Sequence, residues 1–181
     1  MQGSDTVVVR AREGHDDAYR MLVEQHSRAL FRLAFRMTGH QQDAEDVVQE
    51  TLLRAFRQIH RYESRASFGT WLHRIAANCS LDLIRARKRR AWVAELPEVT
   101  DRDPGPDRML YSSDVQRSLA QALDELSAQE RTAFVLRHFE GQSIEEIAAA
   151  LGLNTSAAKN SVFRAVQKLR RRLEPLVGVE L

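Results

Sequence analysis

The sequence predicts an all-α protein built of two small helical domains joined by a flexible acidic linker. Apolar residues recur at steps of three and four along both halves of the chain, and neither half alternates apolar and polar residues as a half-buried strand would. Three of the four prolines lie within ten residues of one another between these halves, where they disfavour helix. A chain of 181 residues is long enough for two small domains.

The N-terminal half contains three helical patterns. The first covers residues 19–37 and stops before Gly39, a residue type suited to the left-handed position after a helix. The second covers residues 43–59, and Phe56 is among the residues of its expected buried stripe. The third covers residues 67–90 and ends in a cluster of cations. We therefore expect one helical domain over residues 1–93.

The C-terminal half has sharper helix signals. The segments Ser127-x-x-Glu130 and Ser143-x-x-Glu146 both have the pattern of a capping box at a helix start. Gly141 and Gly152 lie where a left-handed residue is expected to end a helix. These signals predict a second domain over residues 113–181, with helices at residues 114–125, 128–140, 144–151 and 155–173.

The segment between the domains, residues 94–112, combines proline with acidic residues and predicts a linker. A surface loop inside a single domain is the alternative. The formal net charge of the chain is only +2, but residues 1–92 sum to +5, residues 93–130 to −6 and residues 131–181 to +3. Two basic blocks around an acidic middle favour two surfaces for a polyanion, separated by a segment that avoids it.

The composition excludes several classes of protein. The single cysteine, Cys79, excludes an internal disulfide framework and any multi-cysteine metal site. No apolar run approaches the roughly 18 residues of a membrane span, and residues 1–12 lack the apolar core of a signal peptide, so we expect a cytoplasmic protein without membrane insertion. The histidines are scattered, and the sequence has neither a Ser/His/Asp grouping nor a phosphate-binding glycine loop. We expect no enzymatic activity, no cofactor and no metal.

Residues 143–164 fit a helix-turn-helix. Small Ala148 lets two helices cross closely, and Gly152 lets the backbone turn between them. The second helix then offers short polar groups and cations to the phosphates and base edges of a DNA major groove. A helical hairpin with a solvated basic face is the alternative. The residues expected to face DNA are Thr155, Ser156, Lys159, Asn160, Phe163 and Arg164, with Lys168 extending the basic surface.

The helix at residues 67–90 has a polar face opposite its apolar stripe. At steps of three and four, this face carries Arg74, Asn78, Asp82, Arg85 and Arg89. Tyr62, Phe68 and Trp71 lie beside it, and aromatic rings next to cations suit the unstacked bases of a single strand. Packing in the core is the stronger interpretation for Phe68 and Trp71, whereas Tyr62 lies in a polar loop.

An acidic stripe lies on the helix at residues 43–59. Asp43, Asp46 and Glu50 share one face, which DNA would avoid and a protein partner could contact. The alternative is that these acids only favour the N-terminus of the helix.

Three blocks, in this order along nearly the whole chain, resemble extracytoplasmic-function (ECF) sigma factors of the sigma-70 family. These bacterial subunits direct RNA polymerase to promoters. Residues 43–51 look like region 2.2 of the family, residues 68–78 like regions 2.3 to 2.4, and residues 126–148 like region 4. A helix-turn-helix alone is shared by many regulators, whereas the three blocks across an acidic linker are specific. The resemblance implies a region 2 bundle and a region 4 helix-turn-helix domain.

The resemblance also implies a role in promoter-specific initiation, with partners and contact residues. Region 2.2 would contact the beta-prime clamp helices of core polymerase through Asp43, Asp46, Gln49 and Glu50. The −10 element would be melted and bound by Tyr62, Arg65, Ser67, Arg74, Asn78 and Arg85. The −35 element would be bound by the helix-turn-helix residues Thr155 to Lys168 named above, where Ser161 stands at a position that often carries a cation. The polymerase beta flap and an anti-sigma factor are further implied partners.

A stand-alone helix-turn-helix regulator that acts as a dimer is the second hypothesis. It would need a self-associating helix and a palindromic site, and the sequence offers no obvious dimer seam. Monomeric behaviour in sedimentation would count against it.

Overall fold

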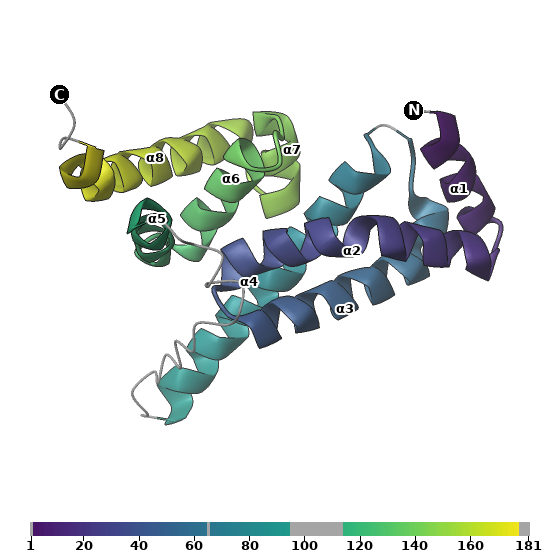
Figure 1. The fold of residues 1–181 in the computed structure, drawn as a ribbon, viewed down its shortest axis with the longest axis horizontal. Helices are drawn as coiled ribbons and strands as arrows, with labels where there is room; N and C mark the ends of the chain where they lie inside the picture. The colour runs from purple at the N-terminus through teal and green to yellow at the C-terminus, as the bar shows by residue number, and fades with distance from the viewer. Residues whose placement is uncertain (1, 65, 95–113, 178–181) are drawn as a thin grey trace.

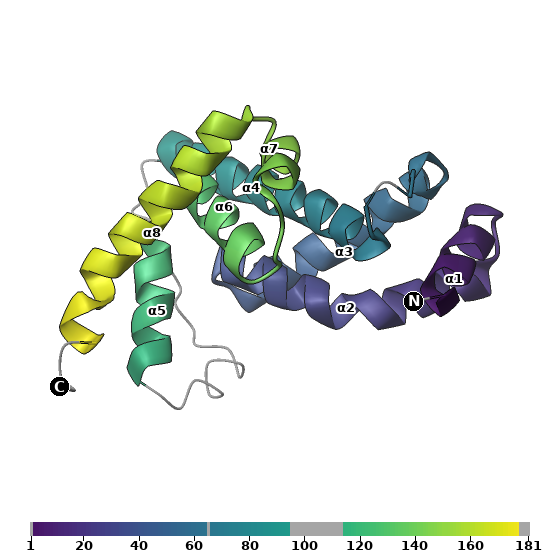
Figure 2. The same ribbon diagram turned by 90° about the horizontal axis from the view of Figure 1, so that it is seen from above.

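Helices account for the regular structure of the chain wherever the structure describes it. The computed structural model describes residues 2–64, 66–94 and 114–177. The elements, shown in Figures 1 and 2, are α1 (Gln2–Arg12), α2 (Asp16–Thr38), α3 (Gln41–Gln58), the 3-10 turn η1 (Ile59–Arg61), α4 (Phe68–Ala94), α5 (Asp114–Asp124), α6 (Ala128–His138), α7 (Ile144–Leu151) and α8 (Thr155–Val177). The all-α fold class is confirmed, and the seven expected helices correspond to α2 through α8.

Helices α2, α3 and α4 pack against one another and form an N-terminal bundle, with α2 and α3 side by side in Figure 1. Helix α2 ends at Gly39, whose φ of 77° is left-handed and whose N–H donates to the carbonyl of Phe35 at 2.8 Å. Glycine adopts this conformation without steric cost. Helix α1, which the sequence interpretation did not include, packs against α2 and buries Val8 and Ala11.

The buried stripe of α3 is narrower than expected. Val47, Thr51 and Ala55 are buried at steps of four, but Phe56 is 51% exposed, so its assignment to the core was wrong. One residue advances a helix by about 100°, which carries Phe56 from the centre of the stripe to its edge. Its ring packs edge-on against the ring of Tyr19, with the centroids 4.9 Å apart.

Both expected capping boxes form in the C-terminal half. Ser127 Oγ accepts a hydrogen bond from the Glu130 N–H, and the Glu130 carboxylate accepts one from the Ser127 N–H. Ser143 and Glu146 do the same at the start of α7. Gly152 ends α7 at a φ of 64°, which lets the backbone turn into α8. Helix α8 then packs across α5, α6 and α7.

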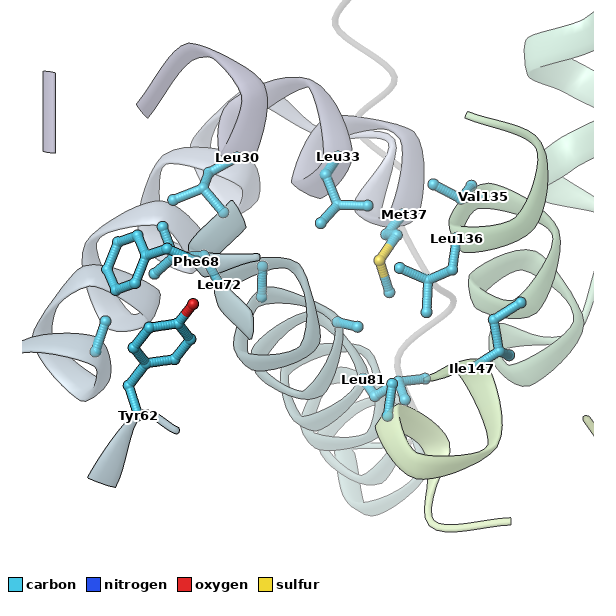
Figure 3. Packing of buried hydrophobic residues seen from close by; sticks show 14 of the residues in the cluster. Leu30, Leu33, Met37, Tyr62, Phe68, Leu72, Leu81, Val135, Leu136 and Ile147 are labelled. Atoms are coloured by element: carbon cyan, nitrogen blue, oxygen red, sulfur yellow. The ribbon is translucent and has the colours of Figure 1, made fainter. Parts of the chain in front are cut away.

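The two halves share a hydrophobic core. Helix α6 packs against α2 and α4, and α7 packs against α4. One cluster of buried side chains contains Met37 and Leu81 from the first half and Leu136 and Ile147 from the second, as Figure 3 shows. The expected linker, residues 94–112, lies outside the described residues apart from its first residue, which ends α4.

Candidate nucleic-acid and protein interfaces

The start of α8 presents the residues that were expected to face DNA. Asn154 precedes the helix, and its Oδ1 accepts a hydrogen bond from the Ala157 N–H at 2.8 Å, which satisfies a free donor of the first turn. Ala158 and Ala165 are fully buried and fix the orientation of the helix. Phe163 is consequently 62% exposed. The other exposed residues of this face are Thr155, Ser156, Lys159, Asn160 and Arg164.

Lys168 is exposed but paired, and Ser161 is buried. Lys168 Nζ lies 2.7 Å from Glu130 Oε2, so this cation is paired within the domain. Burial raises the pKa of the Glu130 carboxyl, but hydrogen bonds from Lys168 and Ser127 outweigh burial and bring the pKa below its usual value. Ser161 is 4% exposed, and its Oγ accepts a hydrogen bond from Gln129 Nε2 at 2.8 Å. Ser161 therefore ties α8 to α6 and does not lie on the exposed face.

A cavity of about 440 Å³ lies where α4 meets the α7 region. Tyr62, Arg74 and Asn78, three of the residues expected at the −10 element, line it from the N-terminal half. Gln142 and Glu146 line it from the C-terminal half. The structure thus brings these −10 residues together, but with the helix-turn-helix as the opposite wall of the cavity.

Tyr62 belongs to an aromatic cluster. It is 6% exposed, and its ring centroid lies 5.4 Å from the centroids of both Phe68 and Trp71. Its hydroxyl donates a hydrogen bond to the carbonyl of Ala66 at 2.6 Å. Tyr62, which the sequence places in a polar loop, is thus as closely packed as Phe68, which is 5% exposed. Trp71 is half-buried and also lines the cavity.

The remaining −10 residues are spread around α4. Ser67 precedes the helix, and its Oγ accepts a hydrogen bond from the Thr70 N–H at 3.1 Å, which caps the helix start. Arg85 is exposed about five turns farther along, on the same helix. Arg65 lies outside the described residues.

The acidic face of α3 keeps three of its four expected contact residues near the surface. Asp46 and Gln49 are exposed, and Glu50 is half-buried in an ion pair with an arginine one turn away. Asp43 is only 9% exposed, and its carboxylate lies 2.5 Å from the guanidinium of Arg87. Asp43 therefore fastens α3 to α4, which the sequence alone did not indicate.

Two further residues of this face, Leu53 and Phe56, were not among the expected contacts. They are 43% and 51% exposed, respectively. Asp46, Gln49, Leu53 and Phe56 follow one another at steps of three, four and three, so they share the outward side of α3. The spacing of these residues in the sequence could have indicated this shared face. Exposed apolar side chains beside polar ones are typical of a protein-binding surface.

In the described parts of the chain, few side chains are arranged for metal binding or nucleophilic catalysis. Across residues 2–64, 66–94 and 114–177, no three His, Cys, Asp or Glu side chains are grouped so that they could hold a metal ion. None of the described helices combines the length and the apolar character needed to cross a membrane. Cys79 is buried, and burial raises the pKa of its thiol, which disfavours the nucleophilic thiolate.

Models of two protein families match the chain. Sigma-70 region 2 matches residues 22–90, and Sigma-70, region 4 matches residues 116–169. The first range contains most of α2, α3 and the greater part of α4, and the second contains the helix-turn-helix.

The sequence is also similar to individual sigma factors. It is 42% identical over 153 residues to the ECF RNA polymerase sigma factor SigE of Mycolicibacterium smegmatis. The match covers 82% of this chain and 59% of that relative. It is 30% identical over 181 residues to the RNA polymerase sigma-H factor of Pseudomonas aeruginosa, which covers 94% of each protein.

Two solved structures share the fold across both halves. The sigma factor RpoE of Bartonella quintana, in complex with the anti-sigma factor NepR, has a TM-score of 0.71 and 27% identity, with 90% of this chain and 98% of that chain covered. CnrH, in complex with the cytosolic domain of CnrY, has a TM-score of 0.65 and 28% identity, with 94% and 96% covered. Similarity over nearly the whole length distinguishes this protein from a stand-alone helix-turn-helix regulator. The chain therefore belongs to the extracytoplasmic-function sigma factors of the sigma-70 family.

Proposed function

We propose that this sigma factor binds core RNA polymerase through the outer face of α3, binds the −10 element with α4 and binds the −35 element with α8. The observation that carries the proposal is the exposed face at the start of α8. There, a helix N-terminus, cations and an aromatic ring project together from a helix fixed by buried alanines. This is the geometry with which a helix-turn-helix enters the major groove.

For polymerase, the proposed contact residues are Asp46, Gln49, Leu53 and Phe56. Leu53 and Phe56 supply apolar surface that binding would bury, and Asp46 and Gln49 supply polar contacts that orient the partner. Asp43 acts indirectly in this proposal, because its ion pair with Arg87 holds α3 against α4. The polymerase partner of this face is the beta-prime clamp helices, and the beta flap is the proposed partner of the C-terminal half.

For the −10 element, the proposed contacts are Arg74, Asn78 and Arg85, with Trp71 as the base-stacking ring. Arg74 and Arg85 are exposed, and Asn78 and Trp71 are half-buried along the same cavity wall. Ser67 positions this group by capping α4. The ring of Tyr62 packs against the ring of Trp71 and helps to hold it in place.

We further propose that residues 1–93 and 113–181 act as separate functional domains, joined by residues 94–112. The protein works as an initiation factor in the cytoplasm, where the polymerase acts, and catalyses no reaction of its own. RpoE and CnrH were solved in complex with the anti-sigma factor NepR and with the cytosolic domain of CnrY, respectively. Their similarity to this chain supports an anti-sigma factor as a further partner.

Transcription from a defined promoter tests the proposal. Transcript starts mapped after overexpression should share an upstream motif with two elements, because both DNA-binding faces must be engaged. Purified protein added to core polymerase should then give run-off transcripts from a template that carries this motif. Core polymerase alone and a template with a scrambled motif are the controls. Equal transcript from both templates would overturn the proposal.

Asp46→Arg tests the polymerase contact. Reversing an exposed charge on the α3 face should weaken binding to core polymerase at least about tenfold, which corresponds to about 1.4 kcal/mol. Glu24→Arg makes the same change at an exposed position of α2 and should leave the affinity unchanged. Binding of −35 DNA by the full-length variant should be unaltered, and unchanged polymerase affinity would refute the assignment.

A further inference from the structure

Small side chains on the inward face of α8 let this helix lie close to its neighbours. Helix α8 packs against α6, and the two helices cross in Figures 1 and 2. Ala158 and Ala165 on this face are fully buried, and Ser161 between them is 4% exposed. Alanine methyl groups form only low ridges, so they permit close packing but resist the rotation of a helix weakly. Polar contacts on the same face therefore matter for how α8 is turned.

The first polar contact joins Ser161 to Gln129, in the first turn of α6. Ser161 Oγ accepts a hydrogen bond from Gln129 Nε2 at 2.8 Å and donates one to the carbonyl of Ala157 at 2.9 Å. The hydroxyl thus uses its donor and an acceptor position within the domain. Because Ser161 is buried and bonded in this way, it is placed to hold α8 against α6 and not to touch a DNA phosphate.

The second polar contact joins Lys168 to Glu130, the residue after Gln129. Lys168 lies seven residues, or about two turns, beyond Ser161, and its Nζ lies 2.7 Å from Glu130 Oε2. Glu130 is 8% exposed and also accepts a hydrogen bond from the Ser127 N–H, so this contact attaches α8 to the capping box of α6. Two adjacent residues of α6 thus hold α8 at two points about 10 Å apart along its axis.

The side chains expected to contact DNA lie directly beside these two points. Lys159, Asn160, Phe163 and Arg164 are exposed on the outward side of α8. One residue advances a helix by about 100°, so a rotation of α8 about its axis would move all four side chains together. Attachment at two points along one face fixes both the rotation and the tilt of the helix. The contacts with α6 therefore set which side chains can meet the base edges.

We propose that Gln129 and Glu130 of α6 are positioning residues for the −35 element, and that they act through Ser161 and Lys168 without touching DNA. The inference rests on the proposed role of α8 at the −35 element. Contacts to base edges require a fixed orientation of the helix, whereas contacts to phosphates carry no sequence information. The two contacts between α6 and α8 therefore support the preference for the −35 sequence over other DNA.

Binding to two DNA duplexes tests the first contact. One duplex carries the −35 element found by transcript mapping, and the other carries the same bases scrambled. Fluorescence anisotropy with the full-length protein gives both dissociation constants, and their ratio should fall about threefold in Gln129→Ala and in Ser161→Ala. The affinity for the scrambled duplex and its salt dependence should stay unchanged, because neither residue is charged. An unchanged ratio in both variants would overturn the proposal.

The ratio separates positioning from a loss of folded protein. A partly unfolded fraction lowers the affinity for both duplexes by the same factor, so it leaves the ratio unchanged. Gln121→Ala makes the same change at an exposed position of α5 and should also leave the ratio unchanged. The double variant of Gln129→Ala and Ser161→Ala should lower the ratio little further than either single variant, because both changes break one contact. Fully multiplied effects would overturn the shared contact.

Glu130→Gln tests the second contact. The glutamine retains an oxygen that can accept from the Ser127 N–H, but it loses the charge that holds Lys168. The ratio should again fall about threefold, and the affinity for the scrambled duplex should rise because Lys168 is free to meet a phosphate. Glu145→Gln makes the same change in net charge at an exposed position of α7 and should keep the ratio. Equal ratios in these two variants would overturn the role of the ion pair.

Distances measured without DNA give an independent readout. Spin labels at His138→Cys on α6 and Arg170→Cys on α8, both exposed positions, report on how the helices cross in a Cys79→Ala background. The distance distribution should be narrow, and it should shift and broaden when Gln129→Ala and Glu130→Gln are added together. An unaltered distribution would overturn the positioning role. A broadened distribution, in a protein that does not prefer the −35 duplex even when unmodified, would overturn the proposed function alone.

Discussion

The two proposed DNA-binding faces contain the same kinds of side chain but present them differently. On α8, Phe163 is 62% exposed among exposed cations and short polar groups. On the α4 side, Tyr62 is 6% exposed, and Arg74 faces a cavity whose other wall is Gln142 and Glu146. The α8 face is formed by one cap and one turn, whereas the α4 face is formed between segments far apart in the chain. The α4 face can therefore be covered by another segment of the chain while its own helix stays folded.

The largest effect is expected from the core that both halves share. Leu136 is fully buried there, so Leu136→Ala should lower the free energy of unfolding by about 2–5 kcal/mol, through lost burial and a residual cavity. Denaturant unfolding followed by circular dichroism measures this loss. Leu53→Ala, on the exposed face of α3, should change the free energy by no more than about 0.5 kcal/mol. Equal losses for the two variants would contradict the placement of Leu136.

Lys159→Ala probes the open face. Lys159 is exposed at the start of α8, where it can neutralise a DNA phosphate. The variant should bind −35 DNA about five- to tenfold more weakly and lower the slope of log affinity against log salt by about 1. Fluorescence anisotropy titrations over a range of salt concentrations measure both quantities. An unchanged slope would remove Lys159 from the phosphate contacts.

Lys168→Ala is the matched comparison on the same helix. Lys168 is already paired with Glu130, so its removal should alter the salt slope by less than half as much as Lys159→Ala does. The same titrations decide between the two residues. A slope change equal to that of Lys159→Ala would mean that Lys168 leaves Glu130 when DNA binds.

The smallest expected effect is on the pH dependence of stability. Burial lowers the pKa of His73, partly opposed by Glu140, and burial together with the nearby charge of His73 lowers the pKa of His26. The unfolded chain therefore binds these protons more readily, so both residues should make the protein less stable as the pH falls below about 6.5. Thermal unfolding at about pH 7.5 and about pH 5.5 measures the loss.

A pair of variants isolates the two histidines. His26→Gln combined with His73→Gln should reduce the difference in melting temperature between the two pH values, because neither side chain then gains a proton on unfolding. His60→Gln, at an exposed position of η1, should preserve the difference. A double variant with an undiminished difference would assign the pH dependence to other groups.

Local signals in the sequence predicted the C-terminal half closely. A capping box reports on contacts within four residues, so the pairs at Ser127 and Ser143 could be found before the fold was known. Periodicity was less precise on α3, because a stripe of apolar residues does not show which member lies at its edge, and Phe56 was placed wrongly. The all-α class and the exposed face of α8 followed from the same local rules.

The contacts that sequence reasoning did not find all join separate helices. Asp43 meets Arg87 across the α3–α4 boundary, and Ser161 meets Gln129 across the α6–α8 boundary. In both cases, a polar side chain of a type usually found at the surface is buried because it contacts a partner on another helix. The position of that partner depends on the angle at which the two helices pack. The cavity shared by the two halves has the same origin, since its walls come from both sides of the expected linker.

The far end of α4 has a consequence for the speed of association. This helix extends beyond α2 and α3 in Figure 1, and five of the six residues at positions 85–90 are lysine or arginine. Arg87 is also paired with Asp43, which anchors the projecting segment to the bundle. A concentrated positive field on a projecting helix draws a polyanion toward the protein before any contact forms, and it weakens steeply with ionic strength. We therefore expect the cations at the end of α4 to speed the approach of a polyanion such as DNA most at low ionic strength.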